Sequence, residues 1–397
     1  MAREGRRRGR WVGGAGVVLG LAVTAGMAGV SSAAARQDED VCSRFGEGAS
    51  AGAVANPALV EISGVAASRQ HEGVWWVHND SGGAPEVSAL SPTGEDRGTY
   101  AIAGADAVDW EDMAVGPGPD PERSYLYVGD IGDNAAQREQ VVVYRVAEPE
   151  ARPDGGGDVL ADAESFTLQY PEGPTDAEAL LVDPLTGDLL VISKDLAGGA
   201  QVFRAGRDEL VGGAELTLER IATIPNPAAG LGVGRDPPAG PVTAADVSPD
   251  GSVVLVRYYG GVSAFLRPPG EALGAAFGIP TCRAPQVAED QGEAIAFGAD
   301  GASYVTVSEG ANPALNRFPI TPPLVPAEPN TEPTDPTADA GARAEDTDDG
   351  LGLVPVVAGS AVVVVLVGGT FLVVARRRRS PRPPAETPTG GAGPRGP

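Results

Sequence analysis

The sequence contains few of the residues on which many catalytic and structural chemistries depend. Its 397 residues include only two cysteines and two histidines, which excludes a disulfide-dense mini-domain and leaves a serine-histidine triad little to work with. No HExxH, Walker A or paired CxxC motif occurs. Basic residues number 29 against 54 acids, so the chain cannot neutralise nucleic acid by bulk charge, and we expect no nucleic-acid partner.

Residues 1–35 have the order of features found in a secretion signal peptide. Arginines within residues 6–10 precede an apolar run of small residues over 11–30, and Ala33-Ala34-Ala35 supplies a cleavage site. We predict that residues 1–35 are removed on export, by the general or the twin-arginine route. An uncleaved anchor is the alternative, but the many glycines and alanines of the run make it a weak permanent span.

Residues 351–375 form an uncharged apolar run that is followed at once by the arginines of 376–379. At about 1.5 Å per residue, a helix of this length crosses a hydrocarbon core of roughly 30 Å, and the positive-inside rule keeps the tail, 376–397, in the cytoplasm. Residues 321–350 are rich in proline and acids and lack aromatics, which predicts a disordered stalk. The sequence therefore predicts a single-pass, type I protein of the cell membrane, with an ectodomain, residues 36–320, outside the cell.

Five segments of the ectodomain share one pattern and recur about every 48 to 67 residues. Each reads as a strand, a turn with glycine, proline or Asp-Gly, and a second strand rich in valine, isoleucine and tyrosine, which is typical of a hairpin. Further β-rich runs usually follow each hairpin, so that one unit contains four strands, as a β-propeller blade does. We therefore predict an all-β, five-bladed propeller. The Pro/Gly-rich residues 225–241 leave a degenerate sixth blade as an alternative.

The repeat places acids where the blades meet at the central channel. In a propeller, the innermost strands begin and the second strands end at the same mouth of the channel. Aligning Gly64, Asp112, Ala179, Asp246 and Ala294 gives a first column at the strand starts that consists of Ser63, Glu111, Glu178, Ala245 and Glu293. The last column, at the ends of the second strands, consists of Asp80, Asp130, Asp195, Tyr259 and Glu309.

The acids of these columns predict a cation site. Like charges this close raise one another's pKa unless cations or hydrogen bonds compensate, and Ca²⁺ suits carboxylates whereas Zn²⁺ prefers histidine or cysteine. The candidate Ca²⁺ ligands are Glu111, Asp112, Asp130, Glu178, Asp195, Asp246, Glu293 and Glu309. The candidates for binding a further ligand are His78, Asn79, Asp80, Asp133, Asn134, Lys194 and Arg257. The alternative is that the acids only accept hydrogen bonds from neighbouring backbone amides.

The only two cysteines of the chain are Cys42 and Cys282. An exported chain meets an oxidising environment, so we predict that they form a disulfide bond, with two free thiols as the alternative. The bond would attach the N-terminal segment to the last part of the propeller, where the ring must close. In the chain-entropy account, closing a loop of this length stabilises the fold by about 5 kcal/mol.

At these repeats the chain resembles exported bacterial β-propellers of the esterase-like, phytase-like group, and more distantly the regucalcin and gluconolactonase propellers. The stretches that carry the resemblance, within residues 55–318, are WVHNDSGG, DWEDMAVGPG, LYVGDIGDN, DAEALLVDP, ADVSPDG and QGEAIAF. The resemblance implies calcium held by channel carboxylates, with hydrolysis of phosphoesters in phytases or of lactones in the gluconolactonase group. Two hypotheses follow: a surface module that binds an extracellular protein, glycan, small molecule or cation, or a metal-dependent hydrolase.

Overall fold

The computed structural model describes residues 41–151, 157–194, 199–225, 240–278 and 280–325. The predicted signal peptide, membrane span and cytoplasmic tail lie outside these residues, as do Asp195 and most of the predicted stalk. Within the described part of the chain, no helix is long and apolar enough to cross a membrane.

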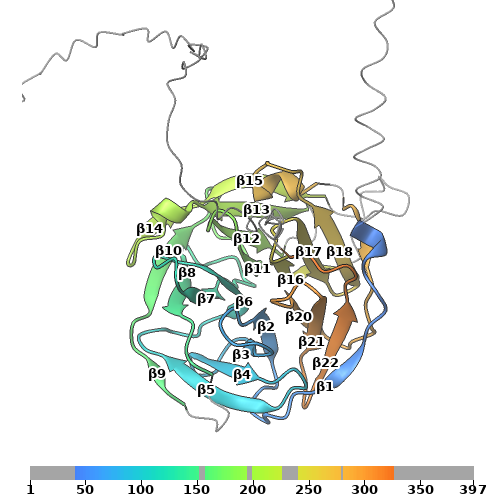
Figure 1. The fold of residues 1–397 in the computed structure, drawn as a ribbon. Helices are drawn as coiled ribbons and strands as arrows, with labels where there is room; N and C mark the ends of the chain where they lie inside the picture. The colour runs from blue at the N-terminus through green and yellow to red at the C-terminus, as the bar shows by residue number, and fades with distance from the viewer. Residues whose placement is uncertain (1–40, 152–156, 195–198, 226–239, 279, 326–397) are drawn as a thin grey trace, which may run out of the picture. The chain divides into compact units, whose positions relative to one another are not determined.

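The described residues form the five-bladed β-propeller that the repeats predict (Figure 1). From the centre outward, blade 1 consists of β2 (Ile62–Ala67), β3 (Trp75–Asn79), β4 (Glu86–Leu90), β5 (Asp96–Ile102) and the short β9 (Val159–Leu160). Blade 2 consists of β6 (Trp110–Pro117), β7 (Ser124–Asp130), β8 (Val141–Ala147), β10 (Glu164–Gln169) and the short β14 (Glu215–Thr217). Blade 3 consists of β11 (Ala177–Val182), β12 (Leu189–Ser193), β13 (Ala200–Ala205) and β15 (Glu219–Ile224).

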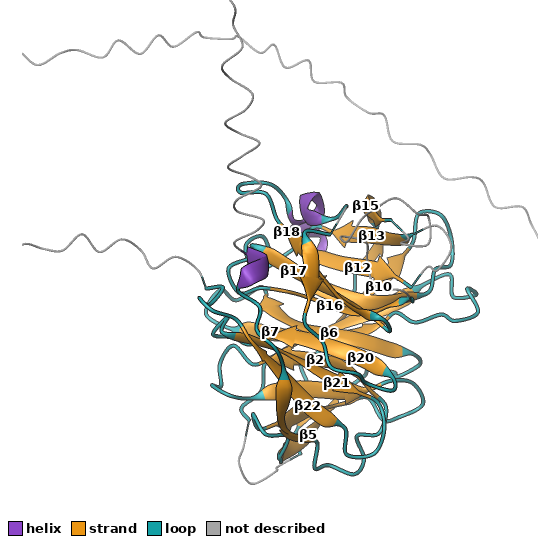
Figure 2. Ribbon diagram, turned by 90° about the vertical axis from the view of Figure 1, so that its right-hand side faces the viewer, coloured by secondary structure: helices purple, strands orange, loops and turns teal. Residues whose placement is uncertain are grey.

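Blades 4 and 5 complete the ring. Blade 4 consists of β16 (Val242–Val247), β17 (Val253–Tyr258), β18 (Gly261–Leu266) and β19 (Cys282–Ala284). Blade 5 consists of β20 (Gly292–Phe297), β21 (Ser303–Ser308), β22 (Ala314–Pro319) and β1 (Ala49–Ala53). Among the described residues, the 3₁₀ turns η1 (Arg207–Glu209) and η3 (Leu273–Ala276) lie between strands. In Figure 1 the first strand of every blade lies at the centre of the ring, and Figure 2 shows β16, β6, β2 and β20 stacked across the middle in the side view.

Apolar packing between blades holds the ring together. The inner strands β2, β11 and β20 are buried at every residue, because both of their faces contact other strands. Buried apolar side chains gather into five clusters, each of which joins two adjacent blades. Trp76 and Tyr100 of blade 1, for example, pack with Trp110 and Tyr144 of blade 2. At about 25 cal/mol per Å² of apolar surface removed from water, this burial is the main favourable term in the fold.

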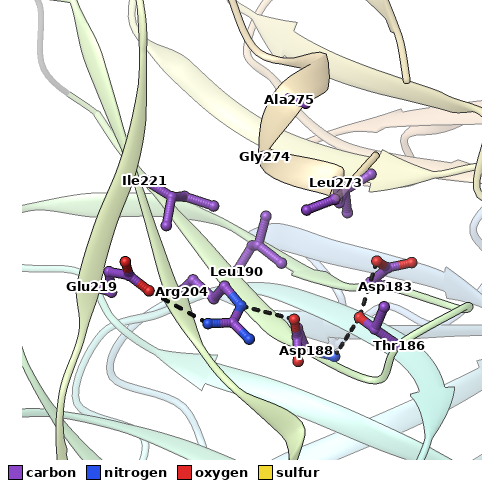
Figure 3. Close-up of a pocket in the computed structure, with 11 residues that line it drawn as sticks. Asp183, Thr186, Asp188, Leu190, Arg204, Glu219, Ile221, Leu273, Gly274 and Ala275 are labelled. Carbon is purple, nitrogen blue, oxygen red and sulfur yellow. Dashed lines mark hydrogen bonds and ion pairs between the residues drawn. The ribbon is translucent and has the colours of Figure 1, made fainter. Parts of the chain in front are cut away.

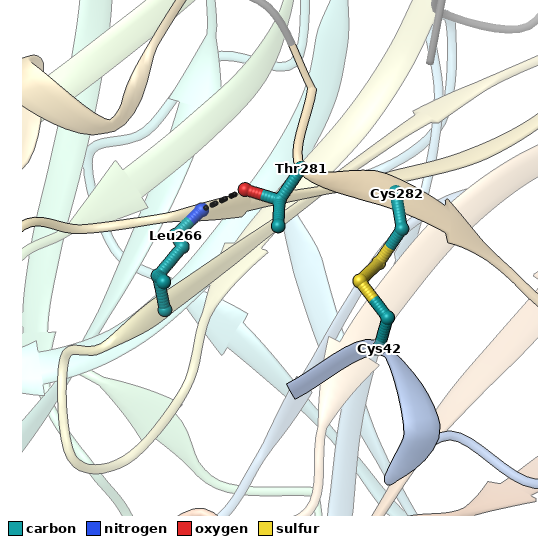
Figure 4. The surroundings of a disulfide bond; sticks show 4 residues. All are labelled: Cys42, Leu266, Thr281 and Cys282. Atoms are coloured by element: carbon teal, nitrogen blue, oxygen red, sulfur yellow. Dashed lines mark hydrogen bonds between the residues drawn. A yellow bond between two sulfur atoms is a disulfide. The ribbon is translucent and has the colours of Figure 1, made fainter. Parts of the chain in front are cut away.

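The start of the chain closes the ring. Strand β1 pairs antiparallel with β22, so the last blade takes its outer strand from the N-terminal segment. Cys42 and Cys282 form a disulfide bond with their Cα atoms 6.1 Å apart, which confirms the predicted pairing (Figure 4). Nearby, the ring of Phe45 packs edge-on against that of Tyr304, with centroids 6.0 Å apart. Because Cys282 begins β19, the N-terminal segment fastens blade 4 to blade 5.

Candidate metal centre

Each inner strand begins with a β-bulge at the mouth of the channel. In all five blades, the pairing between the first and second strands skips one residue near the start of the inner strand. A bulge leaves the skipped residue out of the ladder and re-aims its side chain. The skipped residues are Ser63, Glu111, Glu178, Thr243 and Glu293. The residues that directly follow the paired ends of the second strands are Asp80, Ile131, Lys194, Tyr259 and Glu309.

Blade 4 differs from the column that the repeat alignment predicts. Its bulge lies at Thr243, two residues before Ala245, so Asp246 lies further along β16. One carboxylate oxygen of Asp246 accepts a hydrogen bond from the amide of Val247 (2.8 Å), and the other accepts one from the amide of Phe297 (2.7 Å). Backbone amides therefore engage both oxygens, and the bond to Phe297 joins blade 4 to blade 5, so Asp246 is not a cation ligand at the mouth.

Asp112 has the same structural role between other blades. It is fully buried, and its Oδ2 accepts hydrogen bonds from the amides of Leu180 in blade 3 (3.0 Å) and Ala245 in blade 4 (3.3 Å). Its Oδ1 accepts one from Met113 (2.8 Å). For Asp112 and Asp246, the geometry matches the alternative of carboxylates that bind backbone amides.

Asp130 supports the site without facing it. It is the last paired residue of β7, one position before the residue that reaches the mouth. Its carboxylate accepts hydrogen bonds from the amides of Val108 (3.2 Å) and Asp109 (3.1 Å) and pairs with Arg138 at 2.8 Å. Asp130 therefore positions the loop that carries Asp109.

Three acids from two blades converge at the mouth. Carboxylate oxygens of Asp80, Asp109 and Glu111 lie within 4.8 Å of one another and could hold a metal ion. Glu111 is only 4% exposed, yet none of the described residues donates a hydrogen bond to its carboxylate or forms an ion pair with it. Within the described part of the chain, Oδ1 of Asp80 is also buried without a hydrogen-bond partner. The acids thus point their unused oxygens into a common space.

A glycine makes room for two of these carboxylates. A Cβ atom on Gly132 would lie 2.1 Å from Oε1 of Glu111 and 2.6 Å from Oδ2 of Asp109, distances that real Cβ atoms do not reach. The amide of Gly132 also donates a hydrogen bond to the carbonyl oxygen of Asp109 (3.1 Å). The second glycine of the GDIGDN stretch therefore lets the chain pass directly beneath the acids.

A second cluster shares Glu111 but already contains a cation. Oxygens of Glu111, Asp176 and Glu178 lie within 4.8 Å of one another. The ammonium of Lys194 forms an ion pair with Oε1 of Glu178 and lies 3.8 Å from Oδ2 of Asp176. It also donates a hydrogen bond to Oδ1 of Asn134 (3.2 Å). Lys194 and Asn134, both predicted as ligand-binding residues, are thus brought to the mouth.

The electrostatics of the mouth favour a bound cation. Burial raises the pKa of Glu111 to about 11, and the charge of Glu178 adds to the shift. Burial raises the pKa of Glu178 to about 8, although Lys194 opposes this, and burial together with Asp109 raises the pKa of Asp80 to about 6. Burial lowers the pKa of Lys194, but the charge and hydrogen bond of Glu178 and the charges of Asp176 and Glu111 together raise it to about 12. A divalent cation would therefore replace protons that the acids otherwise retain near neutral pH.

Two acids of blade 5 extend the mouth. The hydroxyl of Tyr259 donates a hydrogen bond to Oε1 of Glu293 (2.9 Å), whose pKa burial raises. Burial and the charge of Glu293 raise the pKa of Glu309 to about 7. The charge of Glu293 also raises the pKa of Asp80, and the charge of Asp80 raises that of Glu309, so the negative field extends from blade 5 to blade 1.

Three of the predicted ligand-binding residues are occupied in the fold. His78 is fully buried, donates from Nδ1 to the carbonyl oxygen of Asn79 (2.8 Å), and has its pKa lowered to about 4 by burial. The side chain of Asn79 donates to the carbonyl oxygen of Ala58 (2.7 Å). Arg257 is buried and paired with Glu289. The side chains of Asn79 and Arg257 are thus engaged within the fold, whereas Nε2 of the buried His78 has no hydrogen-bond partner among the described residues.

Sequence analysis missed two acids of the clusters, Asp109 and Asp176. Each lies two residues before a bulge residue, in the stretches Asp109-Trp110-Glu111 and Asp176-Ala177-Glu178. The repeated acid-x-Glu spacing is the signal that could have identified them. Asp133, a predicted ligand-binding residue, instead positions Asp176, because its amide donates to Oδ1 of that acid (2.7 Å).

A pocket of about 310 Å³ lies away from the acids, between blades 3 and 4 (Figure 3). It lies beside the turn that joins β11 to β12, at the opposite end of β11 from Glu178. Its apolar lining includes Leu190, Ile221 and Leu273. Its charged groups are already paired, since Arg204 lies 2.7 Å from Asp188 and 3.4 Å from Glu219. Asp183 lies 3.0 Å from Arg267. The pocket therefore offers little unpaired charge to a ligand.

One stretch of the chain, residues 48–52, has the form GxSxG. A nucleophile elbow requires a sharp turn between a strand and a helix. Here the serine lies on the outermost strand β1, and the exposed Ser50 hydroxyl donates to the carbonyl oxygen of Gly52 (3.0 Å). This geometry gives no support to a serine hydrolase.

The fold and the acidic mouth define a five-bladed β-propeller with a candidate metal centre in its channel. No protein-family model matches the chain, and no curated protein matches it. Among solved structures, the chain is similar to a gluconolactonase from Xanthomonas campestris, with 14% identity, 65% of this chain and 72% of that chain covered, and a TM-score of 0.36. At this distance the similarity concerns the fold alone, and the resemblance to phytase-like propellers stays a prediction.

Two other solved structures show how general this similarity is. A chain of a mitotic checkpoint complex is 12% identical, with 64% of this chain and 60% of that chain covered and a TM-score of 0.33. Raptor from Chaetomium thermophilum is 10% identical, with 68% and 21% covered and a TM-score of 0.31. Proteins with such different names share this degree of similarity, so it indicates no particular activity for the chain.

Proposed function

We propose that the channel mouth of this propeller binds a divalent cation and that Ca²⁺ fits it best. The observation that carries this proposal is the carboxylate of Glu111, which is buried and has no donor among the described residues. A buried carboxylate of this kind is costly unless it is protonated or binds a metal. Asp80 and Asp109 supply two further carboxylates within reach of the same ion.

The donor set favours calcium over the other common cations. The two clusters contain only carboxylates and no histidine or cysteine, which are the ligands that Zn²⁺ prefers. Ca²⁺ takes about six to eight oxygens in a flexible geometry, so carbonyl oxygens and water can complete a shell that three carboxylates begin. Mg²⁺ demands a near-ideal octahedron and gives up its water reluctantly.

In the cell, we propose that this cation serves a binding surface on an exported, membrane-anchored protein. The disulfide between Cys42 and Cys282 fits an oxidising environment. Calcium sites of extracellular modules have dissociation constants of about 10⁻⁴ to 10⁻³ M, so that the calcium outside cells is sufficient to occupy them. A filled site would neutralise the mouth and present a cation to an extracellular protein, glycan or small molecule.

Calcium titration of the purified full chain tests the proposal. At a hundredfold excess over Kd, calcium should stabilise the fold by RT ln(1+[L]/Kd), about 2.7 kcal/mol, in thermal unfolding with calcium against chelator. Glu111→Gln should remove most of this gain, because it deletes a charged oxygen and keeps the shape. Glu215→Gln, an exposed change on β14, is the matched control and should retain the gain. Unfolding curves that coincide in calcium and in chelator for the unchanged chain would overturn the calcium site.

The same preparations separate binding from hydrolysis. The resemblance implies phosphoester or lactone hydrolysis, so the calcium-loaded chain should be assayed against both classes. A binding module gives no turnover above that of the Glu111→Gln variant. Turnover that requires calcium and disappears in Glu111→Gln would instead assign a metal-dependent hydrolase to the mouth.

A further inference from the structure

The two acid clusters of the mouth share one residue but differ in the charges beside them. The open cluster consists of Asp80, Asp109 and Glu111. The lysine-filled cluster consists of Glu111, Asp176 and Glu178. Among the described residues, no basic side chain lies within ion-pair distance of any member of the open cluster, whereas Lys194 forms an ion pair in the other. Both clusters offer carboxylate oxygens to a cation, but only the second cluster already contains a basic side chain, that of Lys194.

The ammonium of Lys194 fills the space of the second cluster. It contacts Oε1 of Glu178, lies 3.8 Å from Oδ2 of Asp176, and donates to Oδ1 of Asn134 at 3.2 Å. An ammonium has three N–H donors, and three oxygen-bearing side chains surround this one. A calcium ion in the same cluster would need those carboxylate oxygens at about 2.3 to 2.6 Å, so it and the ammonium exclude each other.

We propose that Lys194 is a built-in cation that limits the channel mouth to one divalent ion, held in the open cluster. This inference rests on the proposed function, because it concerns the number of ions at that same site. Without the ammonium, the carboxylates of Asp176, Glu178 and Glu111 are free to take a second ion. The shared Glu111 would then bridge the two ions, as a carboxylate with two oxygens is able to do.

The sequence places this cation in one blade only. Lys194 is the single lysine of the chain. The equivalent positions after the second strands of the other blades are Asp80, Ile131, Tyr259 and Glu309, none of which is basic. A lysine also suits the place better than an arginine, because its compact charge fits among several oxygens, whereas a guanidinium is planar and pairs with them side-on.

The number of calcium ions bound per chain tests the inference directly. The full chain and its variants are dialysed to equilibrium against excess calcium, and bound metal is counted by elemental analysis, with calorimetric stoichiometry as a second measurement. The unchanged chain should bind one ion. Lys194→Met, which keeps the length of the side chain and removes its charge, should bind two. Lys194→Arg, which retains a charge, and Arg97→Gln, which removes a half-buried charge on β5, should each bind one.

A double variant protects the test against a trivial explanation. If the second ion enters the lysine-filled cluster, Lys194→Met combined with Glu178→Gln should return the count to one. One ion in both the unchanged chain and Lys194→Met would overturn the role of Lys194 and leave the calcium site standing. Two ions in the unchanged chain would also overturn it. No bound calcium in either protein would overturn the calcium site itself, and the inference with it.

Discussion

Glu111 and Glu148 are equally buried, with 4% of each residue exposed, yet they have opposite surroundings. Glu148 follows β8 at the far end of the blades from the mouth and joins blade 1 to blade 2. Its carboxylate accepts hydrogen bonds from the hydroxyls of Ser68 and Ser124 and from the indole nitrogen of Trp76 (2.9 Å). Glu111 has no such donor among the described residues, and burial raises its pKa to about 11. Burial alone therefore does not tell a structural carboxylate from a functional one.

The comparison shows which end of the propeller is optimised for stability. Buried polar groups in native proteins nearly always have partners, so an exception calls for an explanation. At the far end there is no exception to explain, because both carboxylate oxygens of Glu148 accept hydrogen bonds. At the mouth, five acids from four blades have raised pKa values with few donors between them, namely Asp80, Asp109, Glu111, Glu178 and Glu293. Proteins keep such costs where a ligand offsets them.

The largest expected effect is on Glu148. Glu148→Ala should lower the free energy of unfolding by about 3 kcal/mol or more, because it leaves the hydroxyls of Ser68 and Ser124 and the buried Trp76 indole without an acceptor. Chemical denaturation of the full chain measures this, with the exposed Glu122→Ala as the control. Glu111→Ala, measured in chelator, should lower the free energy of unfolding far less than Glu148→Ala does. If the two variants ranked the other way, the assignment of Glu148 to structure and Glu111 to function would be wrong.

The repeat in the sequence was sufficient to predict the fold. A strand, a turn and a β-rich strand five times over indicate five blades, and two cysteines in a chain with a predicted signal peptide indicate the disulfide. Both predictions are confirmed. The site was predicted less completely, because its geometry depends on the five β-bulges. A bulge shifts the register by one residue, and with a two-residue period this changes which side chain reaches the mouth.

Individual residues show the effect of that shift. Sequence analysis placed Asp130 and Asp195 in the last column, whereas the register gives that place to Ile131 and Lys194. Asp195 itself lies outside the described residues. Asp112 and Asp246 could not be told from ligands in the sequence, because each has one carboxylate oxygen that accepts from amides of other blades. Long-range pairings of this kind leave no local pattern in the chain.

The next largest effect is expected at Gly132. Gly132→Ala should lower calcium affinity tenfold or more, about 1.4 kcal/mol, because its Cβ would displace the carboxylates of Glu111 and Asp109. Stability in chelator should change much less, since those carboxylates have no partners to lose. Gly83→Ala is the control, because a Cβ at that position meets nothing within 4 Å. An unchanged calcium affinity in Gly132→Ala would place the ion elsewhere.

The smallest expected effect is a dependence of the free energy of unfolding on pH, which arises from the unpartnered Glu111 and its neighbour Glu178. In the calcium-free protein, the pKa of Glu111 is about 11 and that of Glu178 about 8, both above the ordinary value of 4.5. Between pH 5 and 8 the folded state therefore holds more protons than the unfolded state, so stability should fall as pH rises. Each such group contributes at most about 1.4 kcal/mol per pH unit, and water entering the mouth should reduce this to less than about 1.

Denaturation series in chelator at pH 5, 6, 7 and 8 measure this slope. Glu111→Gln should reduce the slope to the part that Glu178 contributes, because the amide has no proton to lose in this range, and should be neutral or stabilising at pH 8. Saturating calcium should also flatten it in the unchanged chain, since the ion replaces the protons. Glu122→Gln, at an exposed site, should leave the slope as it is. A slope that Glu111→Gln does not change would mean that Glu111 is already ionised and paired. The conclusion that Glu111 lacks the partners that Glu148 has would then be wrong.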